Sequence, residues 1–151
     1  MRPALNVALV VALLSGSTRV SAQKPDDDAT VRVSVRESVS ELLPKIVAAF
    51  AAQQITVNHL YEGSRAAAIV AGPFPHDPAT ELTVRVSVWA EGDSTWLAIG
   101  GSYWLTVARQ NFVTVRRSTS GRNGEIWRRL ESLVAAVCAR TTCVESPAER
   151  E

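Results

Sequence analysis

The chain has 151 residues, with 16 basic and 15 acidic side chains and a formal net charge of +1. A chain so close to neutral has no general positive field with which to attract nucleic acid, so a nucleic-acid partner is not expected. Behind a leader segment, the remaining length suits one domain with its own hydrophobic core.

The start of the chain has the three parts of a secretion signal. Arg2 gives the positive start, residues 4–14 form an apolar run, and the stretch VSA before Gln23 matches a small-residue cleavage site. The apolar run is too short to cross a hydrocarbon core of roughly 30 Å as a helix, although a retained N-terminal anchor is the alternative. We therefore expect residues 1–22 to be a signal peptide cleaved after Ala22, a periplasmic or secreted location, and no transmembrane segment in the mature chain.

An acidic stretch, residues 23–29 (QKPDDDA), follows the leader. Its charges and proline are typical of a flexible linker, and its consecutive aspartates lack the alternate spacing and the glycine of a calcium loop. The next segment, TVRVSVR from Thr30, alternates valine with polar residues, which predicts a strand with one dry face.

The first helix is predicted in SVSELLPKIVAAFAAQQ, where apolar residues recur at helical spacing. Ser38 and Glu41 match a capping box, but a helix that starts there has Pro44 inside it, where proline removes a hydrogen bond. A start at Ser40 relieves most of that conflict, so two starting points stay open.

A first hairpin follows. Residues 55–61 and 66–71 are two apolar runs joined by a turn. The segment after them, residues 72–78 (GPFPHDP), is expected to be a stiff surface loop, because prolines cannot donate to a strand ladder.

A second hairpin has the most regular alternation in the chain, over residues 82–89. It leads into a strand at residues 96–107, where Gly100-Gly101 suggests a bulge or a sharp bend. A short strand at residues 111–117 ends the series.

The closing helix has a clear helical repeat of apolar residues, and Ser120 or Asn123 can cap it. The position of its C-terminal end decides whether Cys138 and Cys143 can form a disulfide. A disulfide over this spacing requires the helix to unwind by about Thr141. An exported compartment favours that bridge. The alternative is a buried, unpaired Cys138 with Cys143 loose in the tail.

These elements predict the α+β class, with an antiparallel, curled sheet of about five to six strands and two helices packed on one face. The expected order is β-α-β-β-β-β-(β)-α. It occupies a single domain at residues 30–143, with a disordered tail at residues 144–151.

Alternation places Trp89, Trp96 and Trp104 on the side of the sheet opposite its valine and leucine rows, with Phe112 nearby. Indoles are costly to leave exposed to water. A second buried layer, or a bulge that reverses the alternation, would cover them; an oligomer interface, or a site for an apolar or carbohydrate-like ligand, would use them. The sequence therefore offers these four aromatic residues as a candidate binding surface.

Catalytic and metal-binding patterns are sparse. A small secreted hydrolase would need a base, either His76 beside Asp77 in the proline-rich segment or His59 on a strand, although His59 is more simply a partly buried core residue. No spacing of cysteine, histidine or carboxylate matches a metal site, and no phosphate-binding glycine loop occurs in the sequence. Neither a metal nor a cofactor is expected, and an enzyme is the rival interpretation rather than the leading one.

Arginines concentrate around the last predicted turn and the start of the closing helix, at Arg116, Arg117, Arg122, Arg128 and Arg129. Such a basic patch can attach to an anionic envelope polymer or lipid headgroup. Its commoner role is a solvated surface with local ion pairs.

The order of SVSELLPKIVAAFAAQQ, the strand ITVNHLY, several hairpin strands and GEIWRRLESLVAAV resembles the BamC-like helix-grip domains of envelope-assembly lipoproteins. The resemblance covers most of the mature chain and consists of element order and length. It implies a non-catalytic interaction domain of the cell envelope, but the lipid-bearing cysteine of that family is missing after the leader, so its membrane tether is not expected. The predicted function is an exported binding or assembly module, whose partner is an envelope protein or an apolar or carbohydrate-like ligand.

Overall fold

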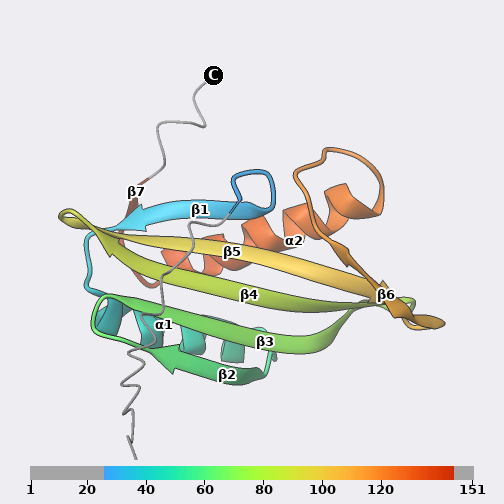
Figure 1. The fold of residues 1–151 in the computed structure, drawn as a ribbon, viewed down its shortest axis with the longest axis horizontal. Coiled ribbons are helices and arrows are strands. Elements are labelled where there is room, and N and C mark those ends of the chain that lie inside the picture. Colours follow the sequence, from blue (N-terminus) through green and yellow to red (C-terminus); the bar gives the residue numbers. More distant parts are fainter. Residues whose placement is uncertain (1–25, 145–151) are drawn as a thin grey trace, which may run out of the picture.

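The computed structural model describes residues 26–144, apart from the side chains of residues 108–110. The expected signal peptide, the start of the linker and the tail beyond Val144 lie outside the described residues. The elements, shown in Figure 1, are β1 (Thr30–Val35), α1 (Val39–Ala52), β2 (Val57–Glu62), β3 (Ala66–Asp77), β4 (Thr80–Glu91), β5 (Ser94–Leu105), β6 (Ala108–Thr114), α2 (Gly121–Cys138) and β7 (Cys143–Val144).

The strands form one antiparallel sheet in the order β2-β3-β4-β5-β1-β7, and β6 pairs with β5 beside this path. The N-terminal half of β5 pairs with β1 and its C-terminal half with β6, so β5 changes partner near Gly100. This topology confirms the predicted α+β class and order of elements, with a seven-stranded sheet where five to six strands were expected.

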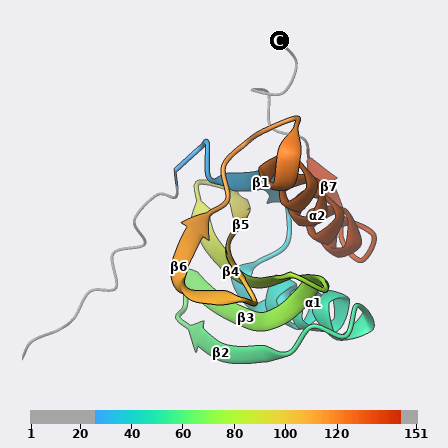
Figure 2. The same ribbon diagram turned by 90° about the vertical axis from the view of Figure 1, so that its right-hand side faces the viewer.

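Both helices lie on one side of the sheet (Figure 2). The helix side, called the inner face below, forms the core: Leu82, Val84, Val86 and Val88 of β4 are all buried there with residues of both helices. Their removal from water is the main favourable term of folding, at about 25 cal/mol per Å² of apolar surface. The opposite side is called the outer face.

Helix α1 begins at the earlier of its two predicted starting points. The Glu41 N–H donates to Ser38 Oγ at 3.4 Å and the Ser38 N–H donates to Glu41 Oε2 at 2.9 Å, which completes the capping box. Pro44 therefore lies inside the helix, where it deletes one hydrogen bond. The full burial of Leu42 and Phe50 against the sheet offsets that loss.

Helix α2 ends at Cys138, which leaves room for a bridge. Cys138 and Cys143 form a disulfide, with Cα atoms 5.4 Å apart. Cys143 belongs to β7 and pairs with Val35 of β1, so the bridge fastens the helix end to the edge of the sheet. Ser120 is the N-cap residue of α2, but its side chain makes no capping hydrogen bond.

The expectation of a loop at residues 72–78 is wrong, because β3 continues through Asp77. The register against β4 shifts after Ala71 and again after Pro75. Such irregularities leave a residue out of the ladder, and proline, which has no N–H, fits a strand at these points.

Of the bulge or sharp bend expected at Gly100-Gly101, the bulge is wrong, since the register of β4 against β5 is unbroken along both strands. A side chain at Gly100 would meet the Ala29 carbonyl oxygen at 2.9 Å, and one at Gly101 would meet Leu82 Cδ1 at 3.1 Å. The two glycines therefore allow close packing on opposite faces of β5.

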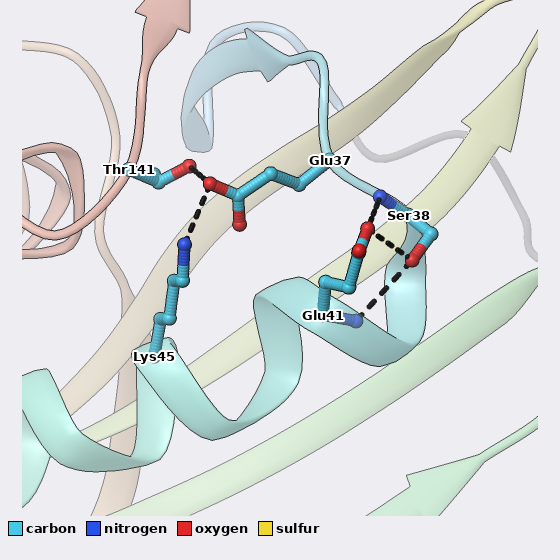
Figure 3. A network of polar contacts seen from close by, with 5 residues as sticks. All are labelled: Glu37, Ser38, Glu41, Lys45 and Thr141. Atoms are coloured by element: carbon cyan, nitrogen blue, oxygen red, sulfur yellow. Dashed lines mark hydrogen bonds and ion pairs between the residues drawn. The ribbon is translucent and has the colours of Figure 1, made fainter.

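A small polar network joins α1 to the segment after α2 (Figure 3). Glu37 Oε1 accepts a hydrogen bond from Lys45 Nζ at 2.6 Å and another from Thr141 Oγ1 at 2.6 Å. Both bonds favour the charged carboxylate, and the bond from Lys45 is the main reason that the pKa of Glu37 is lowered. Because Thr141 lies between the two cysteines, Glu37 holds the disulfide segment close to α1.

Candidate binding groove on the outer face

The strand register arranges the outer-face side chains in rows that cross the sheet. One row passes from β2 through β3, β4 and β5 to β1 and consists of His59, Val70, Arg85, Gly100 and Thr30. The next row, over the same strands, consists of Tyr61, Ala68, Ser87, Ala98 and Arg32. With neighbouring strands about 4.8 Å apart, each row is about 19 Å long.

Small residues occupy the β5 position of both rows and the β4 position of the second row. Ser87, Ala98 and Gly100 rise little above the backbone, whereas Trp104 and Phe112 stand at one end of the same face. This difference in side-chain size hollows the outer face into a groove of about 960 Å³. Its walls come from β2, from β6 and from the segment just ahead of β1.

Arg85 lies on the floor of this groove and is exposed. Its outer-face neighbours are Val70 and Gly100 across the strands, with Thr83 and Ser87 along β4, and none of them is acidic. Within residues 26–144, the side chain of Arg85 forms no ion pair and no hydrogen bond. Its guanidinium therefore presents its N–H donors to the groove.

Hydroxyl groups surround Arg85. Thr83, Ser102 and Thr114 form a further row across β4, β5 and β6 on one side of Arg85, and Ser87 follows Arg85 along β4 on the other side. All four residues line the groove, and their hydroxyls bond to no other residue in the described part of the chain. Each hydroxyl can both donate and accept, so the floor is rich in unused hydrogen-bonding capacity.

The four predicted aromatic residues lie on the outer face, but in two separate places. Trp89 and Trp96 stand opposite each other on β4 and β5 with ring centroids 6.4 Å apart, and they do not line the groove. Trp104 and Phe112 pack edge to face with centroids 4.6 Å apart, and both line it. The eight positions from Trp96 to Trp104 correspond to about 26 Å of strand. The aromatic residues are therefore not one continuous surface.

Within the described residues, neither a second layer nor a reversed alternation covers the indoles, and all three are half-buried. Trp89 and Trp96 shield each other, and Trp89 Nε1 donates to Glu91 Oε2 at 3.3 Å. Trp104 is shielded by Phe112, which is itself 65% exposed. Trp104 Nε1 is buried and has no hydrogen-bond partner in the described part of the chain.

His59 lies at the edge of the groove, so the expectation of a partly buried core histidine is wrong. The pairing of β2 with β3 shifts between Val57 and His59, and this irregularity turns His59 to the outer face. The ring is exposed, stacks against Tyr61 with centroids 6.3 Å apart and lines the groove. Strict alternation along β2 misplaces it because it does not include the extra residue.

His76 and Asp77 lie at the end of β3, outside the groove lining. Asp77 Oδ1 accepts the Ala79 N–H at 2.7 Å, and this bond is the main reason that the pKa of Asp77 is lowered. The carboxylate therefore closes the turn between β3 and β4. The imidazoles of His76 and His59 form no hydrogen bond with a residue in the range 26–144, so neither ring is held by a carboxylate or a hydroxyl there.

The predicted basic patch is divided between two segments. Arg116 and Arg117 lie in the connection from β6 to α2, whereas Arg122, Arg128 and Arg129 lie on α2. Of these five arginines, only Arg116 forms an ion pair within the described residues. Attachment of this patch to anionic envelope surfaces stays a prediction.

The acidic residues ahead of β1 are held by the domain from Asp26 onward. Asp27 pairs with Arg32, and Asp26 Oδ2 lies 3.4 Å from Arg116 Nη1. Residues 26–29 therefore contact the domain, whereas a flexible linker was expected for residues 23–29. The described residues contain no group of three side chains that could hold a metal ion.

Sequence patterns do not single out Arg85 or the hydroxyls around it. The alternation LTVRVSVW does place Arg85 and Ser87 on the polar side of a strand. Their importance appears only when the register sets them beside Gly100 and Ala98, since these residues place no bulky or acidic side chain next to the guanidinium.

Comparison with known protein families gives no match, and comparison with curated proteins gives none either. Neither helix in residues 26–144 is long and apolar enough to cross a bilayer. The functional conclusion therefore depends on the groove itself.

Proposed function

We propose that the chain is an exported, non-catalytic binding module of the cell envelope that holds its ligand in the outer-face groove. The observation that carries the proposal is a groove of about 960 Å³ with the exposed guanidinium of Arg85 on its floor. Concave sites of this size with a few placed polar groups are typical of ligand binding. The secretion-signal pattern of residues 1–22 and the BamC-like order of elements support the envelope location.

The separation of the two faces supports a binding role. Strand residues of the core lie mainly on the inner face, where the helices cover them. The outer-face residues Arg85, Ser87 and Ser102 bear polar groups that the core does not use. Binding is favoured over catalysis because the groove supplies a charge and hydroxyls, whereas His59 at its edge has no described partner to orient it.

Ser87→Trp tests this proposal. Ser87 is half-buried on the groove floor and points away from the core, so an indole at this position would fill the groove and leave the inner face unchanged. Ser64→Trp is the matched control, because Ser64 is exposed between β2 and β3 and does not line the groove. The purified chain and both variants would be titrated with soluble envelope-derived oligosaccharides and peptides and followed by heteronuclear NMR.

We expect the compounds that bind to shift the amide signals of β4 and β5 around Arg85. Ser87→Trp should remove these shifts, and Ser64→Trp should keep them. Circular dichroism of both variants checks that they are folded. Binding that persists in folded Ser87→Trp would place the ligand elsewhere and contradict the proposal.

A further inference from the structure

We propose that the groove selects an oligosaccharide that carries an oxyanion, either carboxylate or sulfate, and that Arg85 recognises this anion. The inference rests on the proposed function of the same groove and adds the chemistry of its ligand. Three features carry it: a guanidinium without an acidic partner, a set of unused hydroxyls, and an aromatic wall.

The anion follows from the charges around Arg85. No acidic side chain neighbours it on the outer face, and it forms no ion pair within residues 26–144. The acidic residue that lines the groove, Asp26, lies 3.4 Å from Arg116 and is neutralised there. The floor therefore keeps one uncompensated positive charge in a hollow, where the fork of N–H donors matches a carboxylate or a sulfate in a bidentate manner.

The saccharide follows from the hydroxyls. Thr83, Ser87, Ser102 and Thr114 line the groove, and their hydroxyls have no hydrogen-bond partner among the described residues. A lipid acyl chain over these groups would remove them from water with nothing to bond to, which is unfavourable. A ligand with many hydroxyls can donate to them and accept from them at every position. The floor thus favours a sugar over an apolar ligand of the same size.

The walls and the length of the groove favour several sugar rings over one. Trp104 and Phe112 line one side of the groove, and His59 of β2, whose ring stacks on Tyr61, lines another. Aromatic faces pack well against rings that combine apolar faces with polar edges. The row that contains Arg85 extends about 19 Å across the sheet, which is long enough for an oligosaccharide to reach from β2 to β1.

The test uses three tetrasaccharide probes and isothermal titration calorimetry of the purified chain at low salt. Tetragalacturonate carries carboxylates only, its full methyl ester carries no charge, and a carrageenan tetrasaccharide carries sulfates only. We expect the better of the two acidic probes to bind at least about tenfold more tightly than the ester, the size of effect that a hydrogen-bonded charge pair gives. The stronger of the two acidic probes identifies the oxyanion.

The Arg85 variants separate charge from the rest of the groove. Arg85→Gln should lower the affinity for the acidic probe to that for the ester, and Arg85→Lys, which keeps the charge without the fork, should give an intermediate loss. Both replacements are on an exposed side chain, so the fold should survive, and circular dichroism verifies it.

The possible failures are distinguishable. Equal affinity for acidic and neutral probes overturns the selection of an anion, and so does an Arg85→Gln variant that still prefers the acidic probe to the ester. If Ser87→Trp abolishes binding in that case, the groove is still the binding site. No measurable binding of any probe overturns the saccharide class. Binding that Ser87→Trp leaves intact overturns the proposed function as well.

Discussion

Arg85 stands directly across from Gly100 in the unbroken antiparallel register of β4 and β5. Gly100 in turn pairs with Thr30 of β1 on its other side. Because Gly100 has no side chain, the segment ahead of β1 comes close enough that a Cβ at Gly100 would meet the Ala29 carbonyl oxygen at 2.9 Å. One glycine beside Arg85 therefore admits the segment that forms one of the walls of the groove.

Gly100→Ala should destabilise the fold by about 1–3 kcal/mol, the usual cost of inserting a methyl group where the neighbours cannot move away. The neighbour is a backbone carbonyl, which has little freedom to shift. Urea denaturation measures the loss. Ser102→Ala is the control on the same face of β5, and it should change the free energy of unfolding by less than about 0.5 kcal/mol. A Gly100→Ala variant as stable as the parent would contradict the close approach.

The division of the aromatic residues gives a prediction about ligand binding. Trp104→Ser should weaken binding of an acidic tetrasaccharide, because Trp104 lines the groove beside Phe112. Trp89→Ser and Trp96→Ser should leave it unchanged, because their stacked pair lies outside the groove lining. Calorimetric titration of the three variants makes the comparison. Equal losses in all three would mean that the indoles act as one surface.

The fold is predictable from the sequence because alternation in the strands and helical spacing in the helices both identify the residues that point toward the inner face. The valines of β4 recur at every second residue, and all of them are buried. Ser38 and Glu41 likewise mark the start of α1 through local chemistry alone.

The groove is harder to predict because it depends on which residues meet across strands. Arg85 is an ordinary polar-side residue until the register places it beside Gly100. His59 changes face because of one irregular position in β2, which no alternation reveals. The distance between Trp89 and Trp104 along the sheet can be calculated from the length of the strands. Because both residues lie on the same face, however, the sequence suggests a single aromatic surface.

The disulfide should stabilise the end of α2. Cys138 and Cys143 are five residues apart, and closing so short a loop stabilises by about 2 kcal/mol on the chain-entropy model. Reductant should lower the free energy of unfolding of the parent by this amount, measured in urea. The double variant Cys138→Ala/Cys143→Ala is the control and should not respond to reductant. An identical response of parent and double variant would show that the bridge adds nothing.

Acid should weaken the fold through Glu37 and Asp77. The pKa of each is lowered in the folded chain, that of Glu37 mainly by the hydrogen bond from Lys45 and that of Asp77 mainly by the Ala79 N–H. Their contribution is therefore fully present above the ordinary carboxyl pKa of about 4 and is lost as the pH falls through the lowered values.

The free energy of unfolding should accordingly be level above about pH 5 and should fall below about pH 4. Denaturation in urea at a series of pH values gives this profile. Glu37→Gln cannot ionise at this position, so its profile should fall less steeply in the acid range. If Glu37→Gln and the parent have parallel profiles, the Glu37 network does not contribute to acid sensitivity.

The most direct test of the groove is amide chemical-shift mapping of the chain with the acidic tetrasaccharide that binds best. The signals that move should belong to β4 and β5 around Arg85, Ser87 and Gly100, and to β6 near Phe112. Shifts confined to the arginines of α2, or to α1 and the free edge of β2, would contradict a binding site on the outer face.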